Sequence, residues 1–516
     1  MIPFFQTNRA ANGQPRSNAG NAPKAIVVGA GFGGMAAALR MRAMGFRVEL
    51  IDRMPRLGGR AQVFRKDGFT YDAGPTVITA PFLFEELFSL FGDDLHRHVD
   101  LRPLDPWYRI VFSDGKTFDY GGTVDDTLKE VERFEPRDRD GYLRLLEMSR
   151  RIFEVGFTEL SDKPFHRLSD MIAQVPRLIR LRSFRTVYQM VSHYIRNDYL
   201  RQIFSVHPLL VGGNPMETTS IYTLIHYLER RWGIHYCMGG MGAMIDALGG
   251  LMLRQGIDVR LGCTVKTIWM ENGRAAGVVL EDGRTESADV VIMNADPPYV
   301  YTHMMPKENQ SGRPDRRVER MQYSMGLFVL YFGTDCRYED IAHHTIWMGP
   351  RFQGLLKDIF QHQKLADDFS LYLHRPTATD PGMAPPGCDG FYVLSPVPNL
   401  QSGIDWQTAG DAYRDRIIDT LQRHLLPGLK QHLVHSFYMT PVDFRNRYLS
   451  LWGTGFSIAP VLSQSAWFRF HNKAAQDGLY FVGAGTHPGA GVPGVLCSAK
   501  VLQNAVQADF PAAVAA

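Results

Sequence analysis

The sequence predicts an α/β fold in which one parallel sheet is assembled from segments that lie far apart in the chain. An apolar run, Lys24–Val28, is followed at once by a glycine-rich turn and a stretch of strong helix formers. A second glycine-rich turn, FVGAGTHPGAGVPG, occupies residues 481–494 near the other end of the 516-residue chain. Between them, Ala288–Met293 is another short apolar run. Such runs are typical of buried parallel strands, so the sheet they predict is discontinuous in sequence.

The first turn has the features of a dinucleotide-binding loop. Gly29, Gly31 and Gly34 give the pattern G-x-G-x-x-G between the strand and its helix. This spacing allows a tight turn, a close approach of backbone N–H groups to a pyrophosphate, and close packing of helix on strand. Phe46–Ile51 predicts a second strand, which ends in Asp52, an acid suited to ribose hydroxyls. A purely structural turn is the alternative, but this order of elements favours a Rossmann-like domain that binds through Gly29, Ala30, Gly31, Gly33, Gly34 and Asp52.

The residues beyond Asp52 resemble a known family. Arg53 is followed by Gly58-Gly59-Arg60, and Asp72-Ala73-Gly74-Pro75 forms a further turn. Together with the loop, they resemble the extended FAD fingerprint of the flavoproteins that include amine oxidases, protoporphyrinogen oxidases and carotenoid desaturases. The resemblance implies FAD as the cofactor and adds these candidate contacts: Arg53, Gly59 and Arg60 along the diphosphate and ribityl chain, Gly74 and Pro75 near the ring, and Val265 against the adenine.

The second glycine-rich turn is explained by the same resemblance. It implies that this turn lies under the isoalloxazine ring while the first lies at the adenosine end, so that both hold one cofactor. The implied contacts are Gly483, Gly485, Gly491 and Val492. Glycines there let the backbone run against a planar ring without a side-chain clash. The chain departs from many flavoproteins at Ala484, where an aspartate often follows the glycine.

Five further stretches narrow the resemblance to the bacterial and fungal type of phytoene desaturase. They are DAGPTVIT (72–79), GGNPMETTSIYTLIH (212–226), SLYLH (370–374), SQSAWF (463–468) and GAGTHPGAGVPGVLCSAK (483–500). The resemblance implies sequential FAD-dependent dehydrogenations of phytoene, a C40 polyene, to neurosporene and/or lycopene, with quinone or oxygen as the electron acceptor. Two alternatives stay open: a carotenoid cis-trans isomerase that uses reduced flavin, and a non-catalytic lipid-binding escort protein of the same fold.

The catalytic candidate is Asp170, which matches an aspartate proposed in that family to lie near the flavin. His487 could also approach the ring, but a histidine in a glycine-rich turn is more often structural. A carboxylate at the start of a helix is the alternative. Pro176 suits a helix start, and Leu181, Phe184, Tyr188 and Val191 would form an apolar stripe beside Arg182 and Arg185. This pattern, with a substrate that dissolves in lipid, predicts a helical membrane-facing part and a peripheral position on the cytoplasmic side of the cell membrane. A helix that simply packs on its own domain is the alternative, since Arg177 and Arg180 interrupt the stripe.

Composition limits the other possibilities. The formal net charge is +3 with no nucleic-acid-reading motif, and the five cysteines contain no Cys-x-x-Cys. His343-His344 lacks spaced partners, so no metal site is predicted. No apolar run reaches the roughly 18 residues of a membrane span. We expect a disordered leader (1–23), an FAD-binding domain (24–100, 255–305 and 476–516), and α+β substrate-binding and helical, membrane-associated domains (101–254 and 306–475).

Overall fold

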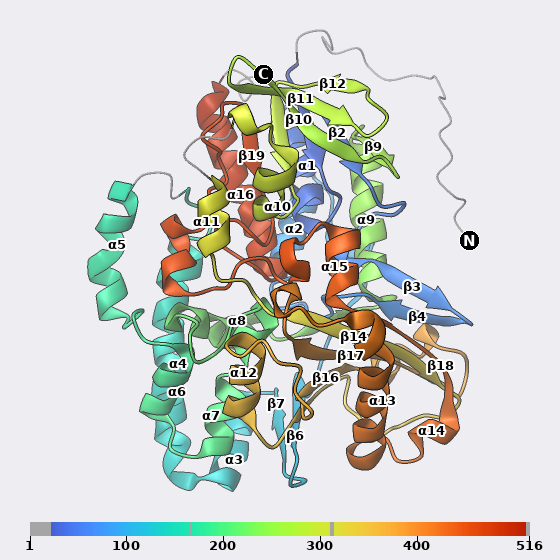
Figure 1. Ribbon diagram of the computed structural model, residues 1–516. Helices are drawn as coiled ribbons and strands as arrows, with labels where there is room; N and C mark the ends of the chain where they lie inside the picture. The colour runs from blue at the N-terminus through green and yellow to red at the C-terminus, as the bar shows by residue number, and fades with distance from the viewer. Residues whose placement is uncertain (1–21, 165–167, 310–313, 512–516) are drawn as a thin grey trace.

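The computed structural model describes residues 22–164, 168–309 and 314–511. All but the last two residues of the predicted leader lie outside these ranges. Two large sheets dominate the molecule and lie in its upper and lower parts in Figure 1.

The upper sheet has five parallel strands from three separate regions of the chain. Its order is β19-β13-β1-β2-β9, and the strands span Leu479–Phe481, Val290–Met293, Lys24–Val28, Arg47–Asp52 and Asp258–Leu261. Each strand alternates its side chains between two cores. Val27 and Ile292 pack on the helices α1 (Phe32–Ala43), α9 (Gly240–Arg254) and α16 (Val492–Asp509). The predicted Rossmann-like α/β class and its discontinuous sheet are therefore confirmed.

A small antiparallel sheet covers the other face. Ile26 and Val291 pack against β10 (Val265–Glu271) and β11 (Arg274–Leu280), which continue into β12 (Thr285–Ser287). The turn between β11 and β12 contains Asp282-Gly283, as the Asp-Gly pair predicts. The FAD-binding domain was predicted to resume at residue 255, which leaves α9 outside it. In the structure, α9 packs against α1.

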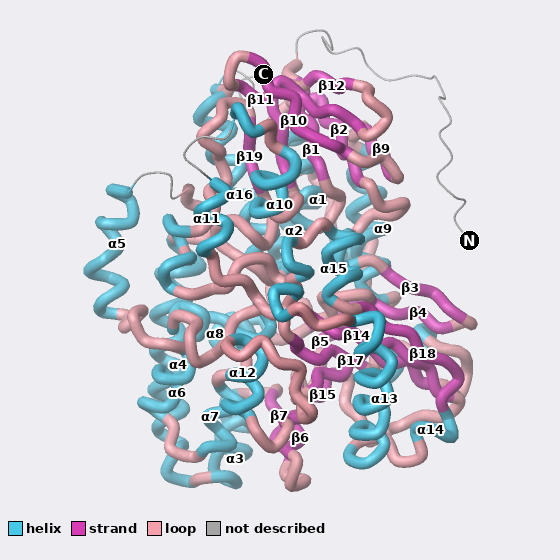
Figure 2. Tube along the Cα trace, in the orientation of Figure 1, coloured by secondary structure: helices cyan, strands magenta, loops and turns pink. Residues whose placement is uncertain are grey.

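The lower sheet is mainly antiparallel and has seven strands (Figure 2). Its order is β18-β14-β17-β16-β15-β6-β7, with bounds Leu433–Met439, Gly326–Thr334, Asp389–Val397, Leu371–His374, His344–Met348, Tyr108–Phe112 and Thr117–Tyr120. Helix α13 (Trp406–His424) packs on one face. The other face receives α12 (Phe352–Phe360) and the hairpin of β3 (Val63–Lys66) and β4 (Phe69–Asp72).

A group of helices completes the lower left of Figure 1. It contains α3 (Val124–Phe134), α4 (Arg139–Phe153), α6 (Val187–Tyr194), α7 (Asp198–Phe204) and α8 (Leu224–Trp232). The remaining elements include α2 (Phe82–Ser89), α11 (Pro314–Arg320), α15 (Pro441–Tyr448), and the pair β5 (Leu101–Pro103) and β8 (His235–Cys237).

Helix α5 (Leu168–Arg180) lies at the outer edge of this group and corrects one prediction. Pro176 is inside α5 rather than at its start. The helix ends at Arg180, and α6 begins only at Val187, where Thr186 and Gln189 form a capping box. The predicted single stripe is therefore divided, since Leu181 and Phe184 lie in the turn and Val191 lies on α6. None of the helices in the described ranges combines the length and apolar character that crossing a bilayer requires.

Candidate functional site

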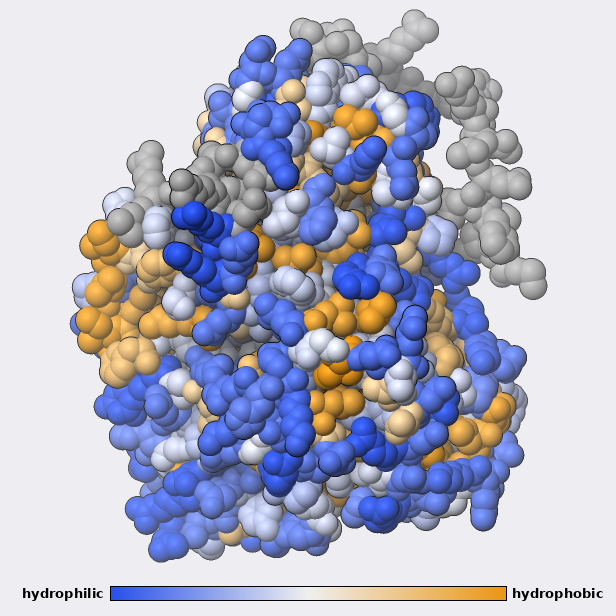
Figure 3. Space-filling model, viewed as in Figure 1, coloured by the Kyte–Doolittle hydropathy of each residue, from blue (hydrophilic) through white to orange (hydrophobic). Residues whose placement is uncertain are grey.

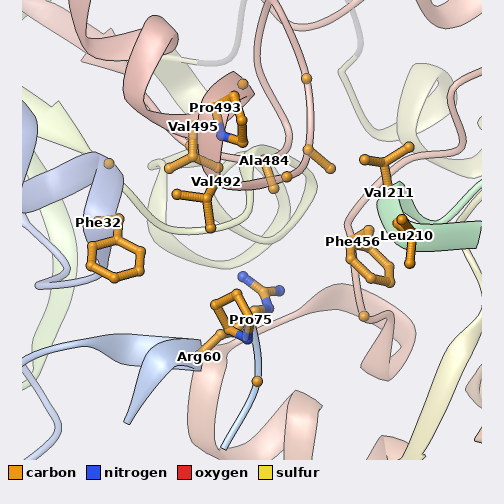
Figure 4. A pocket seen from close by; sticks show the side chains of 18 of the residues that line it. Phe32, Arg60, Pro75, Leu210, Val211, Phe456, Ala484, Val492, Pro493 and Val495 are labelled. Carbon is orange, nitrogen blue, oxygen red and sulfur yellow. The ribbon is translucent and has the colours of Figure 1, made fainter. Parts of the chain in front are cut away.

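One cavity of about 540 Å³ lies between the two large sheets, and both glycine-rich turns line it. Gly31 and Gly33 belong to its wall, and so do Gly483 and Gly491 from the other end of the chain. In Figure 4, Arg60 and Pro75 enter from one side and face Ala484 and Val492 on the opposite side. The two turns therefore form one site and not two separate nucleotide pockets.

The first turn depends on its glycines for geometry. Gly29 has a φ of +105°, which favours glycine, and Gly31 caps α1 without a side chain. A Cβ added to Gly34 would lie 1.8 Å from the Gly29 carbonyl oxygen, so Gly34 allows the helix to pack onto the turn. Gly34 and Ala30 do not line the cavity, whereas Gly29, Gly31, Phe32 and Gly33 of this turn do. The N terminus of α1 is thus open to an anionic group.

Asp52 fixes the loop and also lines the cavity. Its Oδ2 accepts a hydrogen bond from the Ala30 N–H at 2.5 Å, and its Oδ1 accepts one from the Met54 N–H at 2.7 Å. Burial raises the pKa of the Asp52 carboxyl above its ordinary value, while these backbone donors lower it. Each carboxylate oxygen has a further lone pair, so the group can still accept a hydroxyl donor from the cavity.

Asn294 joins the two turns and was missed by the sequence analysis. It follows β13, and its Nδ2 donates to the Gly29 carbonyl oxygen at 3.2 Å. A Cβ on Gly33 would lie 2.6 Å from Asn294 Oδ1 and 3.3 Å from the Gly483 Cα. A Cβ on Gly483 would lie 2.8 Å from the same oxygen. The three residues are in close contact, and only glycines fit beside this asparagine.

The second turn is held by a buried arginine that the sequence analysis also missed. Arg469 donates through Nε to the Thr486 carbonyl oxygen at 2.9 Å and through Nη2 to the Ala484 carbonyl oxygen at 2.5 Å. Ser498 Oγ accepts from the Gly483 N–H at 2.9 Å. Gly485 does not reach the cavity, because it packs against Pro297 and Ser457. Gly483, Gly491 and Val492 do line it.

Arg60 is a half-buried residue that offers the cavity a cation. Its Nε and Nη2 are shielded from solvent and have no hydrogen-bond partner in the described part of the chain, and burial lowers the pKa of the guanidinium. A Cβ on Gly74 would lie 2.3 Å from the Arg60 carbonyl oxygen, so Gly74 lets the two segments meet. A buried guanidinium with free donors beside an open helix N terminus suits an anionic cofactor such as a dinucleotide diphosphate.

The other predicted cofactor contacts line the cavity, whereas the side chain of the catalytic candidate cannot be placed. Gly59, Gly74 and Pro75 line the cavity, and so does Val265 at the start of β10. Arg53 lines it too, and its Nη1 donates to the Asn446 carbonyl oxygen at 2.9 Å. Asp170 is in the first turn of α5, but its side chain lies outside the described residues. Its predicted catalytic role stays a prediction.

Away from the turns, the cavity wall is mostly apolar. Helix α12 contributes one whole face, Phe352, Leu355, Leu356 and Ile359. The facing strands add Leu327, Val329, Ile346, Met348, Leu371 and Leu394. Towards the helical group, Met171, Gln174 and Leu178 of α5 line the same cavity. The geometry combines a site for a dinucleotide with a long apolar chamber.

Among the described lining residues, the carboxylates are Asp52 and Glu229. Glu229 is fully buried, accepts a hydrogen bond from Tyr108 at 3.2 Å, and lies 2.8 Å from His207 Nε2. Both carboxylates are thus engaged within the protein, and neither was chosen as catalytic from the sequence. The chamber favours binding and orientation of an apolar molecule over acid–base chemistry.

Comparison with known proteins agrees with this site. The family model described as flavin containing amine oxidoreductase matches residues 32–501. The lycopene-forming phytoene desaturase of Pantoea ananas is 44% identical over 486 residues, covering 94% of this chain and 99% of that protein. The neurosporene-forming phytoene desaturase of Rhodobacter capsulatus is 41% identical over 501 residues, covering 95% and 96%.

Solved structures show the same fold at low sequence identity. An oxidoreductase from Methanosarcina mazei has a TM-score of 0.63 at 18% identity and covers 93% of this chain and 100% of its own. Wild-type putrescine oxidase bound to putrescine has a TM-score of 0.62 at 15% identity, covering 95% and 99%. The cofactor of this site is FAD, since the cradle fits it and the family is a flavin family. The chain belongs to the flavin-containing amine oxidoreductases and, within them, to the phytoene desaturases.

Proposed function

We propose that this protein catalyses the FAD-dependent desaturation of phytoene in carotenoid biosynthesis, by sequential C–C dehydrogenations that give neurosporene and/or lycopene. One observation carries the proposal: the cavity that begins between the two glycine-rich turns continues without interruption into an apolar chamber. A polyene in that chamber would be held against the FAD ring by dispersion and the exclusion of water. The relatives that form lycopene and neurosporene match along almost the whole chain.

The residues of this chain bind the substrate and orient it. When bound, FAD supplies the hydride acceptor for the hydrogen that leaves one substrate carbon, and the neighbouring carbon loses a proton. The apolar walls of α12 and the facing strands would hold the polyene and orient the C–C bond to be oxidised towards bound FAD. The emerging cation is allylic and partly stabilises itself, which reduces the need for a strong base. We assign the proton to Asp170 or to water, and the electrons to quinone or oxygen.

We further propose that α5 touches a membrane surface and admits the substrate. Three side chains of this region are largely exposed, Ile172 at 61%, Ile179 at 61% and Phe184 at 64%. Apolar side chains gather over α5 in Figure 3. A neighbouring face of the same helix, with Met171 and Leu178, lines the cavity. A helix with lipid-compatible residues outside and cavity-lining residues inside would connect the bilayer with the chamber.

Basic side chains at the end of α5 support contact between this helix and a membrane surface. Arg180 is exposed, and Arg182 and Arg185 follow in the turn. Cations beside an apolar face are attracted to anionic lipid headgroups. This arrangement supports a peripheral position on the cytoplasmic side of the cell membrane, where the substrate is available.

The experiment that tests the main proposal is product analysis. Purified protein is supplied with FAD and with phytoene in liposomes, and the extracted carotenoids are separated by chromatography. The proposal predicts neurosporene and/or lycopene, with a longer chromophore than phytoene. Geometric isomers with an unchanged number of double bonds would instead identify an isomerase. Failure to bind FAD at all, seen as an unchanged absorption spectrum, would identify an escort protein.

A further inference from the structure

Three histidines meet in a buried cluster outside the cofactor cavity. His343 precedes β15, His344 begins it, and His374 ends the neighbouring strand β16. His344 and His374 are paired across the two strands. All three are buried, and one ring nitrogen of each lies within 4.8 Å of those of the other two. The sequence showed only the adjacent pair, because the third ring is brought in by the sheet.

Each histidine ring has a polar neighbour that is not part of the cluster. His343 Nδ1 lies 2.7 Å from Thr379 Oγ1, and His344 Nδ1 lies 2.8 Å from the Tyr372 hydroxyl. His374 Nε2 lies 3.7 Å from Asp72 Oδ2, beyond hydrogen-bond distance but close to a carboxylate. Metal-binding histidines typically have this arrangement, since a second-shell group orients the ring and fixes its tautomer.

Several ring nitrogens of the cluster have no hydrogen-bond partner among the described residues. They are His343 Nε2, His344 Nε2 and both nitrogens of His374, including the Nε2 that faces Asp72. Buried polar atoms without a partner are costly and are rare in folded proteins.

We propose that His343, His344 and His374 form a site for a divalent transition-metal ion, for which Zn²⁺ is the best match. Three neutral imidazoles with an open fourth position are a zinc donor set. Zn–N bonds of about 2.1 Å place tetrahedral nitrogens about 3.4 Å apart. Because the ring nitrogens lie within 4.8 Å of one another, the rings need to close by at most about 1.4 Å. The Asp72 carboxylate beside His374 balances part of the charge. The neighbouring Arg375 is already neutralised by Asp389 at 2.8 Å.

A second cavity lies beside the cluster. It measures about 370 Å³ and is lined by His343 and Thr379 together with Asp105, Glu339 and Arg375. This cavity lies beside His343, whose Nε2 is itself shielded from solvent. On the opposite side, the Tyr372 hydroxyl that contacts His344 also lies 2.6 Å from Thr76 Oγ1, and both of these residues line the cofactor cavity. Tyr372 therefore connects the histidine cluster with the FAD cavity through hydrogen bonds. The inference does not depend on the proposed reaction.

The test measures metal binding by the full-length, FAD-loaded protein. The protein is stripped with a chelator and titrated with Zn²⁺ in competition with a chromophoric chelator, and the bound metal is counted by elemental analysis. We expect one Zn²⁺ per chain, a Zn²⁺-dependent rise in the melting temperature, and no such rise with Mg²⁺, which prefers oxygen ligands. With Co²⁺ in place of Zn²⁺, visible bands of tetrahedral nitrogen coordination should appear.

Two variants decide where the ion binds. His374→Gln should weaken binding at least about 100-fold, since a zinc ligand is lost. His343→Gln on the cavity wall serves the same purpose if the first variant fails to fold. His432→Gln is the matched control, because Asp335, Cys336 and His432 form a rival, more exposed group. No Zn²⁺ binding by the wild type, or binding that survives His374→Gln and His343→Gln but is lost in His432→Gln, would overturn the proposal.

Discussion

At the residue scale, the site depends on contacts between groups that are distant in sequence. Gly33, Asn294 and Gly483 come from three regions of the chain and leave no room for a further carbon atom between them. Asp52 holds the first turn through two backbone donors, and Arg469 holds the second through two carbonyl oxygens. The two glycine-rich turns therefore form one cofactor site. A change in either turn should disturb FAD binding by both.

Gly33→Ala tests this packing. The new Cβ would lie 2.6 Å from Asn294 Oδ1 and 3.0 Å from Val495 Cγ1, so the two turns must separate. We expect FAD affinity, measured by flavin fluorescence titration, to fall about tenfold or more. Gly250→Ala is the control, since it is also a helical glycine but its Cβ would meet only the end of the Arg254 side chain at 3.3 Å. Equal FAD affinity in Gly33→Ala and Gly250→Ala would show that the close contact between Gly33 and Asn294 does not matter for FAD binding.

Asp52→Asn tests the acid at the end of β2. The amide keeps the shape but loses the charge, and its NH₂ group cannot accept from Ala30 or Met54. Hydrogen bonds to a charged group are worth about 1.5–3 kcal/mol, so FAD should bind roughly 10- to 100-fold more weakly. Asp198→Asn, whose side chain is 80% exposed, should bind FAD like the wild type. Unchanged affinity in Asp52→Asn would remove this residue from the site.

The sequence was sufficient for residues whose role depends on local order. Gly29, Gly31 and Asp52 could be assigned because strand, turn, helix and acid follow one another in the chain. Gly34 and Ala30 were expected to contact the cofactor but support the turn from behind, a distinction that needs the position of the cavity. Asn294, Arg469 and His374 could not be found, because their partners are brought near them only by the fold.

At the element scale, α5 is the part that differs most from its prediction. Apolar residues and arginines were recognised, but Pro176 was placed at a helix start and the stripe was extended through Val191. A proline is tolerated in the first turn of a helix and usually disfavoured inside, so a start was the physical expectation. The structure ends the helix at Arg180 and turns the chain before Val187. The most exposed apolar side chains are Ile172 and Ile179, which lie upstream of the predicted stripe, and Phe184, which belongs to it.

Ile172→Asn combined with Ile179→Asn tests the proposed membrane face. Both side chains are mostly exposed, so the fold and FAD content should be unchanged. Loss of two apolar anchors should weaken sedimentation with anionic liposomes on the order of tenfold or more. The matched control is Leu253→Asn with Val434→Asn, which removes two exposed apolar side chains from α9 and β18. Equal liposome binding by both double variants would disprove a specific role for α5.

At the scale of the whole molecule, two sheets of different kinds enclose one cavity. The parallel sheet was predictable because two of its strands, β1 and β19, are followed by glycine-rich turn motifs at their carboxyl ends. The seven-stranded sheet was not, because its strands lack motifs and neighbours such as β6 and β15 are separated by more than 200 residues. Its apolar face becomes the substrate chamber, so the sequence indicated the cofactor more clearly than the chamber.

Hydrogen exchange with and without FAD tests the joint role of the two ends of the chain. A cofactor held by both turns should slow exchange in the segment from Gly29 to the start of α1 and also in Gly483–Val495. Strand β18, an edge of the lower sheet, should exchange at the same rate in both states. Protection of only one of the two turns would mean that they do not share the ligand.

The most direct test of the account is whether phytoene reduces the bound FAD. FAD-loaded protein is mixed with phytoene liposomes in the absence of oxygen and quinone, and the absorption of oxidised flavin is followed. The account predicts that this absorption bleaches, returns when an acceptor is admitted, and that the liposomes then contain a longer polyene. Flavin that stays oxidised in the presence of phytoene, although it can be reduced by dithionite, would contradict it.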